Sequence, residues 1–476
     1  MTPFRPGRLR FAVALVLVTA CVDSSTAPPS NPPPPPPSSP PGIFYGTVVD
    51  SNAANTISAR AIVTATGYDS VYLRFWRDGD TAMRSPAFPF GADSDSTVVV
   101  PVLGLDTVTT YSIETDLVHG DTAYAVDTAT FRTGSLPAWI PRATGVGTGT
   151  PGYVVLSYPD GPVVVDNSGK VVWYLYRPDA ILTSVTPQAD GHYTWGGAAE
   201  SSRAFAVLDD VGDSVGSLGC VGHPTRFHDV LVHASGDAWL LCDDTVTTDL
   251  TAYGGPSNAL VAWTVVQHLD STGTELFSWD AADHFALTDL PAKSLTSTSI
   301  NATHGNGIVL DTDGNILISS RELSEITKID AKTGDIIWRF GGSQNQFTIL
   351  NDPKGSFQRQ HGLEVVGPDE IQLLDDGDSA PSRLVRYRMD PAARTATLVW
   401  SFVDAPTTFT PVGGNSQVLA NGHALVSFGK AGRVDEVDAN GNRVWQLTGI
   451  DGEYVFRAER ITSLYGRHFG DPVGAP

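Results

Sequence analysis

The sequence has little cysteine, with only three residues of this type in 476. They lie at positions 21, 220 and 242, far from the clustered spacing of a structural zinc site. If Cys21 belongs to an export leader, two cysteines remain, and an exported chain with two cysteines can close one disulfide. A separation of 22 residues fits neighbouring strands, so we expect a bond between Cys220 and Cys242. Two free thiols are the alternative.

Positive charge is also scarce. The chain has 30 lysine and arginine residues against 52 aspartate and glutamate residues, which gives a net charge of −22. A field of this sign repels nucleic acid, because nucleic-acid binding depends on neutralising phosphates. It repels small anions as well, so an anion site in this protein needs its own local cations. The sequence therefore predicts no nucleic-acid partner.

The N-terminus has no apolar run long enough to span a bilayer permanently. Residues 1–20 instead have the pattern of a secretory signal peptide, in which three arginines precede a short apolar run. The segment ends in Val-Thr-Ala-Cys at Cys21, which resembles the lipobox of bacterial lipoproteins. We expect a lipid on Cys21 that anchors the exported chain at the periplasmic face of a bacterial membrane. An ordinary signal peptide with an incidental cysteine is the alternative.

Removal of the leader makes the charge balance more acidic, at 27 basic against 52 acidic residues. The next segment is rich in proline, with an unbroken run from Pro32 to Pro37. Such a segment builds no core and adopts extended polyproline II, which rises about 3 Å per residue. We therefore interpret residues 21–42 as a tether between the membrane and the folded part of the chain.

Residues 43–136 have the pattern of a small β-sandwich, in which β-branched and aromatic runs alternate with glycine and aspartate turns. The stretch Leu103–Tyr111 resembles the corner before the penultimate strand of fibronectin type III domains, where a tyrosine hydrogen-bonds back across the corner. No catalytic constellation occurs in this segment, so we predict a structural module. The expected strands are residues 57–66, 71–76, 97–102, 111–116 and 129–133.

A repeat begins near residue 137. Each unit contains a strand, a tight glycine turn, a leucine-rich strand and a final strand that ends in tryptophan. Such four-stranded units predict a six-bladed β-propeller over residues 137–476, and the unit at 183–220 lacks the tryptophan. The fold class is therefore all-β, a propeller preceded by a fibronectin-III or Ig-like β-sandwich. The aspartate-rich turns need no calcium, because Asx turns explain them. The terminal tryptophans are Trp173, Trp279, Trp338, Trp400 and Trp445.

Three consecutive units open with a histidine at nearly the same offset from the leucine-rich strand. These histidines are His228, His304 and His361. Equivalent positions in propeller blades are related by rotation about the central axis, and first strands lie innermost. We therefore expect the three imidazoles to converge at one mouth of the central channel. Three separate histidines, each satisfied in its own surroundings, are the alternative.

Hairpin symmetry adds a cation and two carboxylates to the histidines. Arg321 should face His304 across its hairpin, after an apolar run where a charge is costly unless it points into a wet cavity. A surface salt bridge is the alternative for this arginine. Three imidazoles and a guanidinium would bind a small oxyanion or its ester, and the guanidinium would keep the imidazoles neutral, as a nucleophile requires. The same symmetry places Asp375 near His361 and Asp243 near His228, where carboxylates would fix the imidazole tautomers.

These residues resemble those of the bacterial arylsulfate sulfotransferases, and the resemblance covers most of residues 150–465. It implies a six-bladed propeller with an N-terminal β-sandwich. It also implies ping-pong transfer of a sulfuryl group from an aryl sulfate to a phenol, without a nucleotide sulfate donor. At Asp376 the family usually has asparagine. The segments that carry the resemblance are His304–Arg321, Lys332–Trp338, Gln360–His361, Asp375–Gly377 with Ser382–Arg383, and Phe456–Arg460.

The resemblance also assigns roles. His361 would be the nucleophile that is transiently sulfated, while His228, His304 and Arg321 would bind the sulfuryl oxygens and handle the phenolic proton. The expected partners are a small-molecule aryl sulfate donor and a phenol acceptor, and no cofactor or metal is expected. Further candidates for substrate binding are Asn306, Asp375 and Arg383.

Three other functions stay open at the level of sequence. The chain could instead be a non-enzymatic propeller lipoprotein that binds a ligand or partner, in which the same histidines have no catalytic role. The Gly-Asp-Ile-Ile-Trp-Arg-Phe segment at residues 334–340 resembles a blade motif of quinoprotein-type dehydrogenases. That class of enzyme has eight such blades and commonly an adjacent cysteine pair, and this sequence has neither. A metal hydrolase built on the three histidines lacks a convincing carboxylate ligand set at the same offsets.

Overall fold

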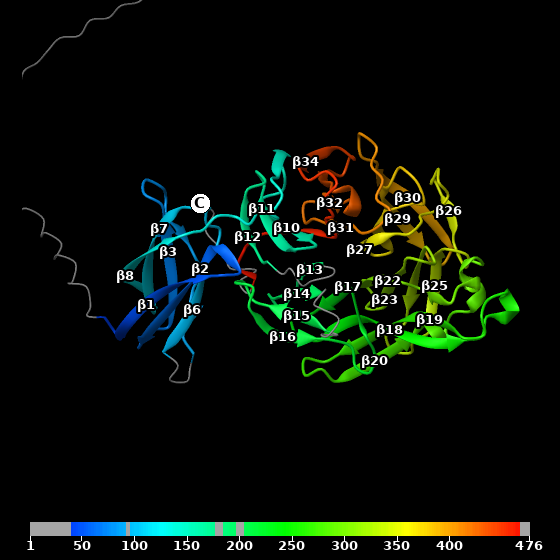
Figure 1. Ribbon diagram of the computed structural model, residues 1–476, viewed down its shortest axis with the longest axis horizontal. Helices are drawn as coiled ribbons and strands as arrows, with labels where there is room; N and C mark the ends of the chain where they lie inside the picture. Colours follow the sequence, from blue (N-terminus) through cyan, green and yellow to red (C-terminus); the bar gives the residue numbers. More distant parts are fainter. Residues whose placement is uncertain (1–39, 92–95, 177–183, 197–203, 467–476) are drawn as a thin grey trace, which may run out of the picture. The chain divides into compact units, whose positions relative to one another are not determined.

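The computed structural model describes residues 40–91, 96–176, 184–196 and 204–466 (Figure 1). The predicted signal peptide over residues 1–20, the predicted lipidation site Cys21 and nearly all of the predicted tether lie outside these residues. In the described ranges, no helix combines the length and apolar character that a membrane crossing requires.

The described residues are all-β, as predicted. They form 35 strands, and their helices are single 3-10 turns. Burial alternates along strands with one face on a core, as in Ser70–Trp76, because successive side chains of a strand point to opposite faces. Strands of the repeat such as Ile316–Ser320 are buried at every position, because both faces of their sheets are covered. The 3-10 turns are η1 (Thr251–Tyr253), η2 (Ala281–Asp283), η3 (Leu287–Asp289), η4 (Ser294–Thr296) and η5 (Gly429–Ala431).

Two sheets lie in the N-terminal region, in the orders β1-β2-β6 and β4-β3-β7-β8, with β5 beside β3. They share one apolar core that includes Leu73, Val100 and Tyr111. The backbone N–H of Asp106 donates to the Tyr111 hydroxyl at 2.8 Å, which is the contact expected at the corner. The first strand was missing from the predicted set. The strands are β1 (Ile43–Asn52), β2 (Asn55–Thr66), β3 (Ser70–Trp76), β4 (Met83–Arg84), β5 (Phe88–Pro89), β6 (Thr97–Val102), β7 (Thr110–His119) and β8 (Thr122–Arg132).

Six sheets, each built on four antiparallel strands, make up the rest of the described chain. The first three take their strands from consecutive stretches of the chain, apart from β35 in the first (Figure 1). The first contains β10 (Tyr153–Tyr158), β11 (Gly161–Asp166), β12 (Val171–Tyr174) and β35 (Ala458–Ile461). The second contains β13 (Ser184–Pro187), β14 (Tyr193–Gly196), β15 (Phe205–Leu208) and β16 (Ser214–Leu218). The third contains β17 (Thr225–Val232), β18 (Ala238–Thr248), β19 (Ala259–Leu269) and β20 (Glu275–Asp280), with β21 (Ser299–Asn301) beside β19.

The remaining three sheets repeat this plan. The fourth contains β22 (Gly305–Leu310), β23 (Ile316–Ser320), β24 (Glu325–Ile329) and β25 (Ile336–Gly341). The fifth contains β27 (His361–Gly367), β28 (Glu370–Asp375), β29 (Arg383–Asp390) and β30 (Thr395–Phe402), with β26 (Thr348–Leu350) beside β30. The sixth contains β31 (Asn415–Val418), β32 (Ala424–Ser427), β33 (Val434–Val437) and β34 (Arg443–Thr448), with β9 (Thr144–Gly147) beside β34.

One edge strand of each sheet contacts the corresponding edge strands of its two neighbours. These strands meet in the cyclic order β35, β13, β17, β22, β27, β31 and back to β35. Two exchanges join the ends of the repeat, since β35 from the C-terminal region completes the first sheet and β9 from the N-terminal side extends the sixth. Side chains on β17, β22 and β27 are therefore brought toward one another from three successive sheets.

The terminal tryptophans of the repeat lie in the last strand of each of five sheets, and two of them bond to a neighbouring sheet. The indole N–H of Trp279 donates to the carbonyl of Gly334 at 3.0 Å, and that of Trp445 donates to Asn167 at 2.8 Å. The aspartates in the turns accept backbone N–H groups two and four residues further on, as Asp270 does from Thr272 and Thr274. This is the Asx-turn chemistry that the sequence predicts.

A buried carboxyl group in the sixth sheet makes stability depend on pH. The side chain of Asp435 is fully buried beside the Asp404 carboxylate, and burial raises the pKa of Asp435 to about 7, with Asp404 adding to the rise. An unfolded aspartate has a pKa of about 3.9, so between these values the native state holds a proton that the unfolded chain has released. This contribution to stability is complete at low pH and is lost as pH rises through 7.

We therefore expect the guanidinium midpoint of unfolding to fall between pH 5 and pH 8 in the wild type, to an extent that Asp435→Asn reduces. The amide keeps the shape of the side chain and has no proton to lose. Denaturation series at several pH values compare the two proteins. An identical pH dependence in both would show that Asp435 does not hold this proton.

Candidate active site

Three successive edge strands carry the three predicted histidines. His228 lies within β17, His304 immediately precedes β22, and His361 is the first residue of β27. Because β22 contacts both β17 and β27, the three side chains approach one another from three sheets. His304 has a φ of +51°, in the left-handed region that costs a non-glycine residue free energy. Such strain persists only where the surroundings hold it, and it is common at functional sites.

His228 and His304 form a contacting pair. Their Nε2 atoms are 3.1 Å apart, and the rings meet edge to face at 82°. The Asn301 amide nitrogen lies 2.9 Å from Nδ1 of His304, and its oxygen accepts from the Arg226 guanidinium at 3.2 Å. Since a guanidinium can only donate, the amide nitrogen of Asn301 must face the imidazole, whose Nδ1 accepts. In the neutral pair, His304 then carries its proton on Nε2 and donates it to Nε2 of His228.

Both imidazoles are held neutral. Burial, followed by the guanidinium groups of Arg226 and Arg321, lowers the pKa of His304 to about 3. Burial likewise takes the pKa of His228 well below its usual range, followed by the effects of His304 and Arg226. Like charges disfavour protonation, so this result is the physical consequence of placing cations around imidazoles. A small anion in the site would reverse it, because its charge favours the protonated ring.

His361 is almost completely buried, at 3% exposure, and faces a carboxylate that the sequence placed one residue too early. Its Nδ1 lies 2.9 Å from Oδ2 of Asp376, off the direction of a good hydrogen bond. Asp375, the predicted neighbour, instead accepts from the Arg383 guanidinium at 2.7 Å and from the backbone of Gln358 at 2.9 Å. The pairing of β27 with β28 is irregular directly after His361. Counting residues outward from the hairpin turn assumes regular pairing, so it predicted the wrong facing residue.

Arg321 lies beside His304, as predicted. Its backbone N–H donates to the His304 carbonyl at 3.1 Å. The guanidinium is 11% exposed, pairs with Glu322 through Nη1, and donates from Nη2 to the Pro411 carbonyl at 3.1 Å. Its Nε is buried and has no hydrogen-bond partner in the part of the chain that the structure describes. Arg321 thus makes a salt bridge and still keeps one N–H for a ligand.

Arg226 is a second guanidinium near the histidines, and the sequence analysis missed it. Asp243, predicted to lie near His228 and fix its tautomer, pairs with Arg226 at 2.8 Å instead. The prediction for Asp243 was wrong because β17 is irregular between Thr225 and Val230, which shifts the facing residues. A signal was present, since Arg226 precedes His228 by only two residues in the sequence.

Two of the predicted substrate-binding residues are committed to protein partners. Asn306 is buried, donates to the Gln360 carbonyl at 2.7 Å and accepts from Ser319 at 2.7 Å. Arg383 is 3% exposed and pairs with both oxygens of Asp352 as well as with Asp375. The hydrogen bond from Asn306 therefore holds Gln360, the residue before His361, in place. The ion pair of Arg383 with Asp375 holds the segment before Asp376. Both support the frame of the site.

Two aromatic side chains border the histidines. The Phe456 ring meets His228 edge to face at 6.0 Å between centroids, and Tyr454 lies 6.1 Å from Phe456. Burial raises the pKa of Tyr454 to about 12, Asp376 adds to the rise, and Arg321 opposes it. Tyr454 is therefore close to both the carboxylate and the guanidinium of the site. An aryl ring bound next to the histidines would find apolar contacts here.

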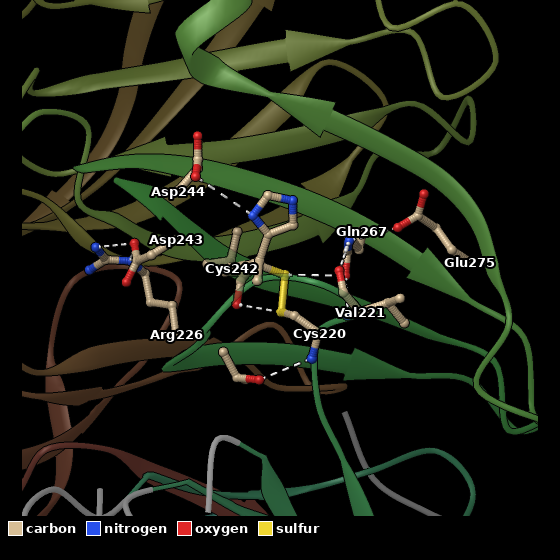
Figure 2. The surroundings of a disulfide bond; sticks show 11 residues. Cys220, Val221, Arg226, Cys242, Asp243, Asp244, Gln267 and Glu275 are labelled. Atoms are coloured by element: carbon tan, nitrogen blue, oxygen red, sulfur yellow. Dashed lines mark hydrogen bonds and ion pairs between the residues drawn. A yellow bond between two sulfur atoms is a disulfide. The ribbon is translucent and has the colours of Figure 1, made fainter. Parts of the chain in front are cut away.

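Cys220 and Cys242 form a disulfide at the base of the strand that carries His228 (Figure 2). Their Cα atoms are 6.1 Å apart, and Thr225 of β17 pairs with Cys242 in the sheet. Figure 2 shows Arg226 and its partner Asp243 beside the bond. The disulfide thus fixes the segment from which Arg226 and His228 project.

Removal of this disulfide by Cys220→Ala with Cys242→Ala is expected to reduce the free energy of unfolding by about 3 kcal/mol, because it frees a closed loop in the unfolded chain. Denaturant unfolding of the variant and of the wild type, each with and without reductant, measures the effect. Reductant should shift the wild type toward the variant and leave the variant unchanged. Equal stability of the oxidised wild type and the variant would contradict this role.

Among the described residues, no three histidine, cysteine, aspartate or glutamate side chains gather in an arrangement that could hold a metal ion. The arrangement that is present combines neutral imidazoles, two guanidinium groups and one buried carboxylate. It suits the binding and transfer of a small anionic group.

Residues 221–450 match the family model described as "Arylsulfotransferase (ASST)". The matched segment includes all three histidines, Arg321 and Asp376. No curated protein matches the chain. Solved structures similar to it include a protein of unknown function from Bacteroides caccae, at 12% identity, over 66% of this chain and 100% of that one, with a TM-score of 0.44. A streptogramin B lyase matches at 11% identity over 66% and 99% of the two chains, with a TM-score of 0.38.

Proposed function

We propose that this chain transfers a sulfuryl group from an aryl sulfate to a phenol through a sulfated His361, as the match of residues 221–450 to the arylsulfotransferase family model supports. The observation that carries the mechanism is the contact pair His228–His304 next to Arg321, with His361 close enough to lower the pKa of both imidazoles. The proposal needs no nucleotide sulfate donor and no cofactor. The donor is a small aryl sulfate ester, and the acceptor is a phenol.

The proposal includes the architecture of the chain. The six four-stranded sheets, with edge strands that meet in a closed cycle, are the blades of one propeller over residues 137–476. The two N-terminal sheets and the Tyr111 corner are those of a fibronectin-III-like sandwich over residues 43–136. The sandwich carries none of the charged groups of the site, which fits a structural role.

Donor binding uses the cations of the site. The unpartnered Nε–H of Arg321 can donate to a sulfuryl oxygen, and charge-assisted bonds of this kind are the strong ones. Phe456 and Tyr454 offer contact to the aryl ring. Burial and the nearby guanidinium groups keep His228 and His304 neutral in the free protein. The negative charge of the ester favours the protonated form, so the pair gains a proton as the ester binds.

In the first half-reaction, the lone pair on Nε2 of His361 forms a bond to sulfur while the bond from sulfur to the aryl oxygen breaks. The leaving phenolate takes the proton from the His228–His304 pair, a step that contributes about 10²–10⁴-fold when the acid is well placed. A loose transition state of this type depends mainly on positioning and on stabilising the charge on the transferred oxygens. The products are a phenol and sulfated His361.

In the second half-reaction, the acceptor phenol gives its proton to the neutral imidazole pair. Its oxygen then attacks sulfur, and the bond between sulfur and Nε2 breaks. The lone pair returns to His361, and the new aryl sulfate leaves. Release of the anion lowers the pKa of the pair again, so the proton returns to solvent. Atoms and charges balance over the cycle.

An exported, lipid-anchored location at the periplasmic face of a bacterial membrane belongs to the same proposal. It rests on the leader pattern, on the lipobox at Cys21 and on the proline-rich tether. The Cys220–Cys242 disulfide fits it, because such bonds persist in oxidising compartments.

Steady-state kinetics of the full chain test the proposed function. Para-nitrophenyl sulfate and phenol are varied together, and release of para-nitrophenol and formation of phenyl sulfate are both measured. A ping-pong route predicts release that depends on phenol and parallel lines in double-reciprocal plots. Release without phenol, or transfer only from a nucleotide sulfate, would contradict the proposal.

A further inference from the structure

We propose that Asp376 is the positioning residue of His361: it holds the imidazole proton on Nδ1, directs Nε2 toward sulfur, and supplies the negative charge against which the sulfated ring forms. This inference rests on the proposed function and deepens it. The two groups come from adjacent strand ends in the fifth sheet, since His361 opens β27 and Asp376 follows β28. Their closest atoms, Nδ1 and Oδ2, are 2.9 Å apart.

In the described parts of the chain, the side chain of Asp376 makes no contact that would explain it as a purely structural carboxylate. Its side chain is 0% exposed, and neither oxygen has a well-aligned hydrogen bond within the described ranges of the chain. A buried carboxylate left in this state is costly, and native proteins usually avoid it. Asp375, one residue earlier, is tied to Arg383 and to a backbone N–H. Asp375 thus accounts for the local frame, and Asp376 is left for His361.

Two groups next to Asp376 favour its ionised form. Burial raises its pKa, whereas His361 and Arg321 oppose the rise. As His361 becomes positive, the carboxylate gains a full opposite charge at contact distance, and that gain occurs only during the reaction. Interactions that strengthen on the way to the transition state are those that raise a rate. The charged and titratable groups near Asp376 are His361, Arg321, Arg359, Asp375 and Tyr454.

The step itself can be written with its charges. Neutral His361 carries a proton on Nδ1 and a lone pair on Nε2. When Nε2 bonds to sulfur and the aryl oxygen leaves, the ring becomes an imidazolium, and a small rotation of either side chain aligns the Nδ1 proton with Asp376. The proton stays on Nδ1, and the ring and the carboxylate form an ion pair. When the acceptor oxygen displaces Nε2, the ring is neutral again.

Asp376→Asn tests this role because asparagine has nearly the same shape, can still accept from Nδ1–H and lacks the charge. Rapid mixing of the full chain with para-nitrophenyl sulfate alone measures the rate of the single sulfation step as a burst of para-nitrophenol. Because asparagine is the usual residue of the family here, the variant should still sulfate, but more slowly by a factor on the order of ten, the difference between a charged and a neutral acceptor. Asp435→Asn is the matched control, since Asp435 is an equally buried carboxylate in another sheet. That control should keep the wild-type burst rate.

The pH profile separates positioning from a loss of folding. The wild-type burst rate should fall as pH drops through the raised pKa of Asp376, because the carboxylate must be ionised. In Asp376→Asn this decline should move to a different pH, because the amide does not titrate and only protonation of the nucleophile itself is left. Nitrogen NMR of the wild-type imidazoles adds a measurement without any variant, and it should find neutral His361 protonated on Nδ1. A wild-type burst rate and pH profile in Asp376→Asn, or His361 protonated on Nε2, would overturn the inference. If the wild type itself gave no burst and no transfer to phenol, the proposed function would fail instead.

Discussion

Replacement of His361 by alanine is expected to remove transfer of the sulfuryl group to phenol, with a loss on the order of 10⁴–10⁶-fold in kcat. The proposed mechanism requires this loss, because in it every turnover passes through a bond between sulfur and Nε2 of His361. The remaining imidazoles cannot take over, since Nε2 of His228 and Nε2 of His304 face each other at 3.1 Å. The measurement is the rate of phenyl sulfate formation from para-nitrophenyl sulfate and phenol.

The matched control for this variant is His233→Ala. His233 directly follows β17, in the turn before β18, and pairs with Asp237 at 2.8 Å instead of with a group of the site. It should keep wild-type kcat. If His361→Ala transferred sulfuryl groups at more than a few per cent of the wild-type rate, the nucleophile would have to be another residue, and His304 would be tested next.

The second large effect concerns the proton of the leaving group, for which His304→Ala is the test. With a strongly basic leaving group such as the phenolate of phenyl sulfate, loss of the acid should reduce the sulfation rate by about 10²–10⁴-fold. With para-nitrophenyl sulfate the loss should be much smaller, because that phenolate is stable without a proton. Burst rates over a series of aryl sulfates of different leaving-group basicity measure the difference.

The way the rate depends on the leaving group separates loss of an acid from a general loss of donor binding. A variant that merely disturbs donor binding loses the same factor with every donor, whereas loss of an acid makes the rate fall steeply as the leaving phenol becomes less acidic. His228→Ala should behave like His304→Ala, since the two rings share one proton in the contacting pair. An equal loss for all donors in both variants would show that the pair does not protonate the leaving group.

The all-β class and the order of the repeat could be predicted because their signals are local. Glycine and aspartate turns, alternating burial and a terminal tryptophan are each set by a few neighbouring residues, and the predicted tryptophans lie in the last strands of their sheets. The exchanges of β9 and β35 were not predicted, because they pair segments about 300 residues apart in the chain. Nothing in Thr144–Gly147 or Ala458–Ile461 alone indicates which sheet each strand joins.

In the site, too, the features set by neighbouring residues could be predicted, and those set by contacts between sheets could not. The matched offsets of His228, His304 and His361 could be read from the repeat, because equivalent strands carry equivalent residues. The carboxylate at His361 was misplaced by one residue, since a ladder irregularity follows that histidine. Asn301, which orients His304, was missed because its own amide is fixed by Arg226 from another strand. Such choices depend on packing between sheets, which no count along the sequence contains.

The central claim, that His361 carries the sulfuryl group, is tested most directly by mass spectrometry of the enzyme mixed with para-nitrophenyl sulfate in the absence of phenol. The account predicts that the intact chain gains the mass of one sulfuryl group, that peptide mapping places it on His361, and that added phenol removes it and yields phenyl sulfate. No mass gain in an enzyme that transfers to phenol, or a sulfuryl group on another residue, would contradict it.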